Sequence, residues 1–546
     1  MSSRAVVHPS GRKTGSAAQV TVREAVFDLF RAFRLTTIFG NPGSTELPMY
    51  RDFPSDFRYI LGLQESICVG MADGFAQATR SAALVNLHSA VGVGHALGNI
   101  FTAFRNQTPL VITAGQQARS ILPYEPFLFS QQAAEFPWPY VKWSCEPARA
   151  EDVPAAIARA YYTAMQAPRG PTFVSIPVDD WDQPGTPLEP RTVSGTVAGD
   201  PAMLAETAAA LARARRPAIV VGAAVAYDDA WDETVALAER HQAAVWVSPM
   251  SARNSFPEDH RLFAGFLAAD RAKVVESLSG SDFILVLGAA VFTYHREGFG
   301  PHVPVGAQLV QLVDNPAMAA RAAAGVSIVT DLKLGVRALL EGPAPARRST
   351  PRSPQRPPRL TGKPFTVSYL MQEIASLRPK DSIIVEEAPS ARGPMHDYLP
   401  ILEKDGFYTC ASGGLGHGLP AAVGVAMGRT DRLVIAILGD GSSMYSIQGL
   451  WSAAQLGLRI AFIIVNNGGY IALNEFGLLF DIANPPGTDL PQLDFCGLAE
   501  SQGVRAIRVG RAADLRAALT DAFKTTGPIL VEIMLGRAAE ARPGEA

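Results

Sequence analysis

The sequence predicts an α/β protein built from three doubly wound parallel sheets, and three observations lead to this fold class. The chain has 546 residues, which suits about three domains that each bury a core. Apolar runs of strand length alternate with segments of helical periodicity, as in βαβ units. Two stretches rich in proline and other turn-forming residues, 186–200 and 342–362, separate three such blocks.

These stretches divide the chain into an extension, three domains and a long linker. Residues 1–18 are polar and basic and contain no apolar run, so we expect a disordered extension and no secretion signal. The three domains are expected at 19–185, 200–341 and 363–537. Residues 342–362 are rich in proline and arginine and are expected to form a semi-extended linker.

In the first domain, residues 22–33 have the apolar spacing of a helix, and five apolar runs predict strands. The strands are expected at 36–39, 59–63, 83–87, 110–114 and 173–176. Glu65 follows the second strand at the start of a helix, where a carboxylate can simply complement the helix N-terminus. His88 lies at the end of the third strand, where a buried core histidine is the ordinary interpretation.

The same alternation predicts the elements of the other two domains. In the middle domain, helices are expected at 202–213 and 228–241, and strands at 218–221, 244–247, 283–287 and 308–312. In the third domain, a strand is expected at 433–438, a helix at 446–456 and a second strand at 460–465.

The third-domain unit carries the most informative pair of turns. Asp440 follows its first strand, and Asn467 follows its second. In a βαβ unit both turns lie at the same edge of the sheet, so the carboxylate and the amide oxygen converge there. Oxygen ligands of this kind suit Mg²⁺ that is shared with phosphates. Either turn alone would be ordinary turn chemistry, but the combination is specific.

Composition argues against several classes of partner. The formal net charge of −3 gives no reason to expect nucleic acid or anionic lipid. No uninterrupted apolar run reaches the length of about 18 residues that a membrane helix needs. The four cysteines are scattered without metal-like spacing, which suits a reducing cytoplasm. We therefore expect a cytoplasmic protein that acts on a small molecule.

Several segments carry a resemblance to a known family. They include IFGNPGSTELP (38–48), DFRYILGLQESICVGMADGFAQATR (56–80), NLHSAVGVGHALG (86–98), CASGGLGHGLPAAVGVA (410–426) and the stretch from GDG to NN. Over about residues 20–536 the chain resembles the thiamine diphosphate dependent 2-oxo acid decarboxylases, most of all the benzoylformate decarboxylases. The resemblance implies an aminopyrimidine-binding first domain, a Rossmann-like middle domain and a diphosphate-binding last domain.

The resemblance also implies the reaction and the assembly. Thiamine diphosphate with Mg²⁺, which Ca²⁺ could replace, would support non-oxidative decarboxylation of an aromatic 2-oxo acid of the benzoylformate type to the aldehyde and carbon dioxide. The active site would lie between first and last domains of different subunits. A homodimer is then the minimal unit, and a tetramer is the usual assembly.

Residue by residue, the match implies a set of roles. Glu65 would hold N1′ of the cofactor, His88 and His295 would move protons, and Ser44 would contact the substrate carboxylate. The other expected cofactor contacts are Ser390, Gly413, Leu415, Asp440, Gly441, Ser442, Asn467, Gly469 and Tyr470, with Asp440, Asn467 and the Gly469 carbonyl as metal ligands. The expected substrate pocket consists of Ser44, Phe127, Leu128, Thr409, His417 and Phe476.

Two departures from the family pattern leave alternatives open. Residues 386–393 (EEAPSARG) replace a Ser/Thr-rich diphosphate segment and keep one hydroxyl, that of Ser390. Thr409 and His417 stand where aromatic residues are expected, so a ring substituent that hydrogen-bonds to them is a reasonable extension of the substrate. The alternatives are a carboligase of the acetolactate synthase type and a catalytically retired structural subunit.

Overall fold

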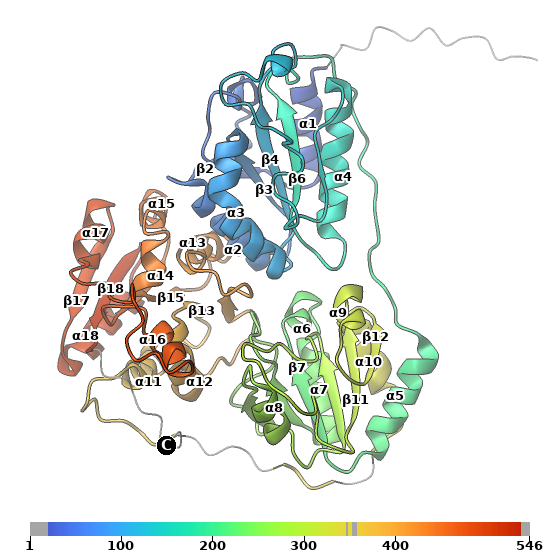
Figure 1. Ribbon diagram of the computed structural model, residues 1–546, viewed down its shortest axis with the longest axis vertical. Helices are drawn as coiled ribbons and strands as arrows, with labels where there is room; N and C mark the ends of the chain where they lie inside the picture. The colour runs from blue at the N-terminus through green and yellow to red at the C-terminus, as the bar shows by residue number, and fades with distance from the viewer. Residues whose placement is uncertain (1–19, 346–347, 352–356, 537–546) are drawn as a thin grey trace, which may run out of the picture.

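The computed structural model describes residues 20–345, 348–351 and 357–536. The predicted extension, residues 1–18, lies outside the described residues, as do 346–347, 352–356 and 537. Three parallel sheets of six strands form three lobes (Figure 1). The predicted fold class is therefore confirmed.

The first sheet has the strand order β2-β1-β3-β4-β6-β5. Its strands are β1 (Thr37–Gly40), β2 (Arg58–Leu61), β3 (Ala83–Leu87), β4 (Leu110–Gln116), β5 (Ser144–Cys145) and β6 (Thr172–Pro177). Its helices are α1 (Val22–Ala32), α2 (Glu65–Thr79), α3 (Ser89–Arg105) and α4 (Val153–Met165), with 3₁₀ turns η1 (Leu47–Tyr50), η2 (Leu122–Tyr124) and η3 (Ala150–Asp152). The sequence does not predict β5, because two residues are too short to show a periodicity.

The middle sheet has the order β9-β8-β7-β10-β11-β12, which is the 3-2-1-4-5-6 order of Rossmann folds. Its strands are β7 (Pro217–Val221), β8 (Ala244–Val247), β9 (Phe263–Phe266), β10 (Phe283–Leu287), β11 (Gln308–Val313) and β12 (Val326–Val329). Its helices are α5 (Pro201–Arg213), α6 (Ala224–Tyr227), α7 (Trp231–His241), α8 (Arg271–Ser277), α9 (Pro316–Ala320) and α10 (Leu332–Leu340).

The predicted helix 228–241 is wrong at its start. Asp229 has a φ of 53°, and the Asp228 carboxylate accepts the Leu332 N–H at 2.9 Å. Both features interrupt the helix, which begins at Trp231. β9 and β12 were also not predicted from the sequence.

The third sheet has the order β14-β13-β15-β16-β18-β17, the same as the first sheet when strands are counted from its own start. Its strands are β13 (Ile383–Glu387), β14 (Phe407–Thr409), β15 (Val434–Gly439), β16 (Ile460–Asn466), β17 (Arg505–Val509) and β18 (Ile529–Met534). Its helices are α11 (Val367–Leu377), η4 (Pro389–Ala391), α12 (Arg392–Tyr398), α13 (Gly418–Gly428), α14 (Asp440–Met444), α15 (Gly449–Gln455), α16 (Ile471–Leu478), α17 (Phe495–Ser501) and α18 (Ala512–Phe523).

The helix expected at 446–456 is shorter in the structure. Ser446 and Gly449 make turn hydrogen bonds between α14 and α15, and the helix begins only at Gly449. The expected βαβ unit is otherwise present, with Asp440 directly after β15 and Asn467 directly after β16.

The first and third domains pack through a crossing of α2 and α13, which lie between the two lobes in Figure 1. Glycines make the crossing close: a Cβ on Gly424 would lie 1.9 Å from the Met71 carbonyl oxygen, and a Cβ on Gly74 would lie 2.1 Å from that of Ala421. One apolar core includes residues of both sheets and of these two helices. Because α2 begins with Glu65 and α13 follows Leu415, the crossing sets where these two segments lie relative to one another within one chain.

Candidate active site

The first-domain site residues follow β1, β2 and β3. The strand order reverses between β1 and β3, and such switch points are where ligands bind in open α/β sheets. Ser44 is exposed in the turn after β1, whereas its neighbours Thr45 and Glu46 are buried. His88 follows β3 as the N-cap residue of α3.

Glu46 organises this part of the site. Its Oε2 accepts the Gly43 N–H at 2.8 Å and lies 2.8 Å from His88 Nδ1. Its Oε1 accepts the Gly115 N–H at 2.9 Å and the Thr45 hydroxyl at 2.7 Å. The hydrogen bond with Glu46 raises the pKa of His88 above its ordinary value. Glu46 was not predicted as a site residue. Its position in the turn between β1 and η1, close to Ser44, could have indicated a role in the site.

Glu65 is the first residue of α2, and its side chain is mostly buried. The helix is capped by Gln64, whose Oε1 accepts the Ser66 N–H at 2.7 Å. Glu65 Oε2 lies 3.0 Å from Nδ1 of His95 on α3. The carboxylate is thus held by a side chain of α3, and it is not the capping group of its own helix. The sequence analysis did not single out His95.

The loops that carry the expected metal ligands of the third domain meet at Asp440. The buried Asp440 carboxylate accepts four backbone N–H groups, from Gly441 (2.7 Å), Asn467 (3.2 Å), Gly468 (2.8 Å) and Gly469 (3.1 Å). Burial raises the pKa of Asp440, and these N–H groups oppose the rise. Asn467 Oδ1 is buried and has no hydrogen-bond partner. A buried amide oxygen without a partner beside a carboxylate fits a hard cation such as Mg²⁺.

Among the described residues, no group of three or more His, Cys, Asp or Glu is arranged to hold a metal. The site around Asp440 would instead combine one carboxylate with amide and backbone oxygens. Tyr470 packs against Gly441, where an added Cβ would lie 2.3 Å from the ring. Gly413 has a φ of 73° and open space where a side chain would stand. These glycines leave the backbone approachable for a phosphate-bearing ligand.

The altered segment after β13 is built around two buried carboxylates. Glu387 accepts the N–H groups of Gly416 at 2.6 Å and His417 at 2.8 Å, at the start of α13, and burial raises its pKa to about 7. Glu386 pairs with Arg392 at 2.6 Å. Ser390 lies beyond them on η4 and is partly exposed. Glu387 therefore fixes the Gly416 end of the loop that carries Leu415, a role the sequence did not predict.

His295 lies at the junction of the middle and third domains. Its ring contacts that of Phe476 on α16, with 4.6 Å between centroids. Since α16 follows Asn467 and Tyr470 directly, the contact places His295 beside the elements that hold the expected metal site.

Three family models match the chain. They are described as thiamine pyrophosphate enzyme, N-terminal TPP binding domain (residues 20–134), central domain (204–339) and C-terminal TPP binding domain (390–533). Benzoylformate decarboxylase of Pseudomonas aeruginosa is 44% identical over 519 residues, which cover 94% of this chain and 98% of the relative. The chain belongs to the thiamine diphosphate dependent 2-oxo acid decarboxylases.

Solved structures agree with this family. Benzoylformate decarboxylase from Polynucleobacter necessarius superimposes with a TM-score of 0.92 at 39% identity, covering 95% of this chain and 99% of that chain. The 4-hydroxybenzoylformate decarboxylase of Rhodococcus jostii RHA1 gives 0.92 and 39%, covering 95% and 100%. The expectations of a carboxy-lyase and of thiamine diphosphate as its cofactor are confirmed.

Two expected pocket residues of this decarboxylase have other roles in the structure. The Thr409 hydroxyl donates to the carbonyl oxygen of Glu386 at 2.8 Å. His417 is 1% exposed and pairs with the buried carboxylate of Asp73 on α2. Both side chains are enclosed in the protein, so the expectation that they bind a ring substituent is wrong. Their polarity serves the contact between β13 and β14 and the crossing of α2 with α13.

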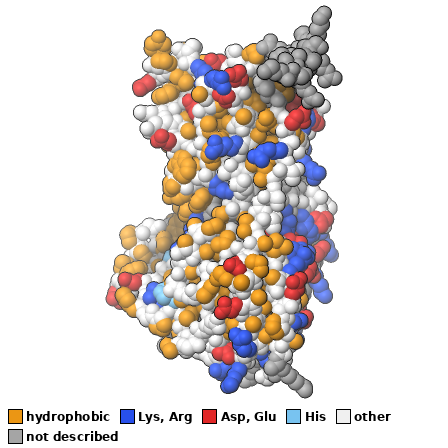
Figure 2. Space-filling view, turned by 90° about the vertical axis from the view of Figure 1, so that its right-hand side faces the viewer, with side chains coloured by type: hydrophobic (Ala, Val, Ile, Leu, Met, Phe, Trp, Pro, Cys, Tyr) orange, Lys and Arg blue, Asp and Glu red, His pale blue; other side chains and the backbone are white. Residues whose placement is uncertain are grey.

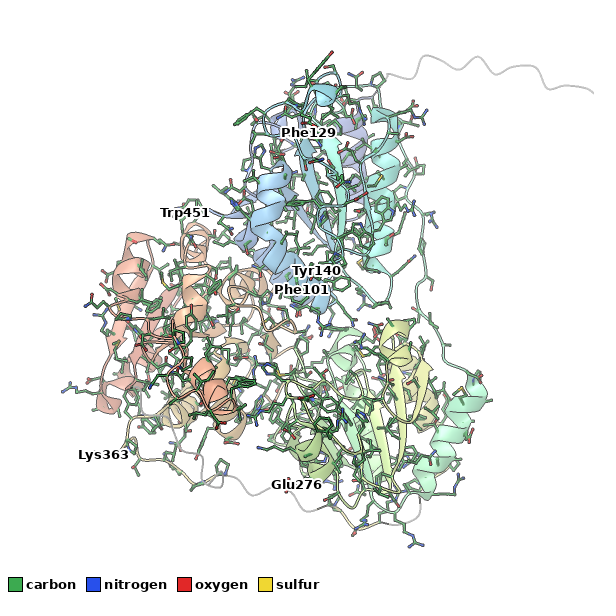
Figure 3. The ribbon with its side chains drawn as sticks, in the orientation of Figure 1. Phe101, Phe129, Tyr140, Glu276, Lys363 and Trp451 are labelled. Atoms are coloured by element: carbon green, nitrogen blue, oxygen red, sulfur yellow. The ribbon has the colours of Figure 1, made fainter. Side chains whose placement is uncertain are left out.

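The expected apolar wall at Phe127 and Leu128 lies on the loop after η2. Phe127 is 87% exposed, whereas Leu128 is partly buried. The same loop is fixed at its far end by Tyr140, whose ring lies 4.7 Å from that of Phe101 on α3 (Figure 3). In a single chain, Phe127 therefore closes no pocket.

The distribution of charged side chains on one face agrees with the small formal net charge of −3. Acidic and basic side chains are interspersed on the face shown in Figure 2. Within the part of the chain that the structure describes, no helix has the length and apolar character needed to cross a bilayer.

Proposed function

We propose that the enzyme decarboxylates an aromatic 2-oxo acid of the benzoylformate type without oxidation, giving the aldehyde and carbon dioxide. The observation that carries the proposal is the pair of His88 and buried Glu46, 2.8 Å apart at the switch point of the first sheet. Because Glu46 raises the pKa of His88, the imidazole of His88 stays protonated to a higher pH than that of a free histidine. A proton donor at this edge suits release of an aldehyde, in which carbon takes a proton after carbon dioxide leaves.

In this proposal the first domain of one subunit and the last domain of another hold each cofactor between them. Bound thiamine diphosphate supplies the electron sink that no amino-acid side chain offers. Glu65 holds a proton at N1′. Leu415 would support the cofactor from the loop before α13, and Gly413 leaves room beside it. Ser390, Gly441 and Ser442 are placed to contact the diphosphate.

We assign the metal to the loops after β15 and β16. Asp440, Asn467 Oδ1 and the Gly469 carbonyl oxygen would hold Mg²⁺. The support is the convergence of Asn467 on Asp440 and the unpartnered buried oxygen of Asn467. Ca²⁺ could fill the same oxygen site.

The substrate would meet residues from three segments. Ser44 in the exposed turn after β1 is assigned to the substrate carboxylate, and His295 to a second proton transfer. Phe476, against which the His295 ring packs, would form an apolar wall for the aromatic ring. Phe127 and Leu128 would complete the wall where a second subunit approaches.

The assembly and the location are part of the proposal. We propose a homodimer as the minimal unit, a tetramer as the assembly and the cytoplasm as the compartment. The four cysteines are free in the structure, as expected in a reducing compartment. The large exposed side chains Phe127, Leu478 and Phe480, which are 87%, 64% and 72% exposed, suit burial by another subunit.

The test is a panel of benzoylformate, 4-hydroxybenzoylformate and pyruvate with the purified enzyme, thiamine diphosphate and Mg²⁺. Aldehyde, carbon dioxide and hydroxyketone are measured together. We expect aldehyde and carbon dioxide in equal amounts from the aromatic acids and little turnover of pyruvate. Hydroxyketone as the main product would indicate a carboligase, and no product from any acid would indicate a structural subunit.

A further inference from the structure

One face of α3 carries a stripe of polar and small residues. The stripe consists of His88, Gly92, His95, Asn99, Thr102 and Asn106, from the N-cap to the C-cap of the helix. Their spacing alternates between four and three residues, which places them along one side of a helix. The stripe faces α2 and the loop before α13.

Hydrogen bonds from the stripe connect these two elements. Asn99 Nδ2 donates to the Ser66 carbonyl oxygen at 2.7 Å and lies 3.4 Å from that of Gly416. The Thr102 hydroxyl lies 2.8 Å from that of Ser412. The Asn99 side chain therefore holds both Ser66, which follows Glu65, and Gly416, which follows Leu415.

Glu65 lies against the middle of the stripe. Gly92 leaves space for the carboxylate, because a Cβ there would lie 3.2 Å from Oε1 and 3.3 Å from Cγ. His95, one turn further along, has Nδ1 3.0 Å from Oε2. Gln64 Nε2 donates weakly to the His95 carbonyl oxygen at 3.4 Å. The carboxylate is thus enclosed on one side by α3 and held through one of its two oxygens.

We propose that His95 is a positioning residue that orients Glu65 toward N1′ of the cofactor. The inference rests on the role proposed for Glu65. With Nδ1–H donating to Oε2, rotation of the carboxylate is restricted, and Oε1 is left to share a proton with the ring nitrogen. No bond is made or broken at His95, so its effect acts only through Glu65.

The competing interpretation is a surface ion pair without consequence. The His95 side chain is 55% exposed, and exposed pairs contribute little to stability. A positioning role differs from this interpretation because it predicts a change in the bound cofactor. Exchange of the C2 proton of bound thiamine diphosphate with solvent deuterium reports this change directly, without substrate turnover.

The experiment compares His95→Leu, His95→Asn, Glu65→Gln and wild type as holoenzymes with thiamine diphosphate and Mg²⁺. Leucine removes the donor, whereas the asparagine amide places an N–H near the position of Nδ1. We expect C2 exchange to slow about tenfold with leucine, which corresponds to about 1.4 kcal/mol, and to remain near the wild-type rate with asparagine. The dissociation constant of thiamine diphosphate, measured on the same samples, should rise with leucine and remain unchanged with asparagine.

His260→Leu is the matched control, because His260 forms another histidine–glutamate pair, 3.3 Å from Glu239 in the middle domain. It should leave C2 exchange unchanged. The inference is overturned if His95→Leu exchanges at the wild-type rate while Glu65→Gln does not, if asparagine fails to rescue, or if His260→Leu slows exchange equally. If Glu65→Gln exchanges the C2 proton at the wild-type rate, the proposed role of Glu65 is wrong, and the proposed role of His95 is wrong as well.

Discussion

Replacing Glu46 with glutamine changes the centre of the first-domain part of the site, because each oxygen of this carboxylate has two hydrogen-bond partners. Oε2 faces the Gly43 N–H and His88 Nδ1, each at 2.8 Å. Oε1 faces the Gly115 N–H at 2.9 Å and the Thr45 hydroxyl at 2.7 Å. Glutamine keeps one oxygen, so in either orientation its NH₂ group faces two groups that donate to Glu46 in the wild type, of which the Thr45 hydroxyl can turn to accept.

Two unsatisfied buried donors cost about 2–6 kcal/mol of unfolding free energy, at about 1–3 kcal/mol each. With the amide oxygen toward Gly115 and Thr45, neutral His88 can accept a hydrogen bond from the NH₂ group through Nδ1. One penalty is then removed, and about 1–3 kcal/mol remains. Glutamine also removes the negative charge that favours protonated His88, so we expect the pKa of His88, which Glu46 raises in the wild type, to fall.

The direction of the pH dependence follows from this shift. In the wild type, stabilisation linked to the raised pKa of His88 is fully present below the ordinary histidine value of about 6.5. It is lost as pH rises through the raised pKa. The variant should therefore differ most from wild type at low pH and least at high pH. With His88 as proton donor, the alkaline limb of kcat/KM should move to lower pH in the variant.

The assay measures kcat/KM for benzoylformate and the thermal midpoint across pH at constant ionic strength. Midpoints are compared because a chain with three domains does not unfold in one step. Thr113→Val on β4 is the control, since the buried hydroxyl it removes bonds the Asn86 amide at 2.9 Å and the Val85 carbonyl oxygen at 3.3 Å rather than Glu46 or His88, and its alkaline limb should stay in place. An unshifted alkaline limb in a folded Glu46→Gln enzyme would refute the reasoning.

Three further predictions concern the metal and the domain crossing. Asp440→Asn should weaken Mg²⁺-dependent binding of thiamine diphosphate by more than about 100-fold, because residues that only hydrogen-bond to metal ligands already contribute about 10–100-fold to metal affinity. Fluorescence titration measures the affinity for thiamine diphosphate, and an unchanged affinity would contradict the assignment of Asp440. Chelation of the wild type should release the cofactor into the filtrate, and re-addition of Mg²⁺ should restore binding; retention would show that no metal is needed. Gly424→Ala should lower the thermal midpoint, because its Cβ would lie 1.9 Å from the Met71 carbonyl and overpacking costs about 1–3 kcal/mol. Gly98→Ala on α3 is the control, because a Cβ there has no atom within 4 Å, and alanine should raise the free energy of unfolding by about 0.5–1 kcal/mol. Equal thermal midpoints in the two variants would exclude the helix crossing as the cause.

The fold class and many of its strands could be predicted because buried parallel strands are continuous apolar runs, although β13, β14, β17 and β18 were not predicted. The run Phe283–Leu287 is predicted with its observed bounds for this reason. β5 could not be predicted, because it contains only two residues, and β12 is partly exposed at the end of its sheet. The break before α7 depends on Asp228 accepting an N–H from Leu332, a contact between distant residues that local periodicity does not contain.

The candidate site could be predicted where chemistry is local in sequence. Asp440 and Asn467 lie in two turns of one βαβ unit, and the structure joins these turns through the Asn467 backbone N–H, which donates to the Asp440 carboxylate at 3.2 Å. His95 and Glu46 were missed because each acts through a residue on another element. Thr409 and His417 were misassigned for the same reason, since their partners Glu386 and Asp73 lie on other strands and helices.

The shared strand order of the first and third sheets gives the two domains equivalent elements where they pack against one another. Counted within each sheet, β2 corresponds to β14, and the helices that follow them, α2 and α13, are equivalent and cross one another. Their starts carry Glu65 and the Leu415 loop, and Asn99 lies within hydrogen-bonding distance of both segments. In the same comparison, His88 after β3 corresponds to Asp440 after β15. The ends of equivalent strands thus carry different chemistry, a titratable imidazole in one domain and a buried carboxylate in the other. The Rossmann order of the middle sheet offers no such equivalence, which is consistent with its contribution of a single loop residue, His295, to the proposed site.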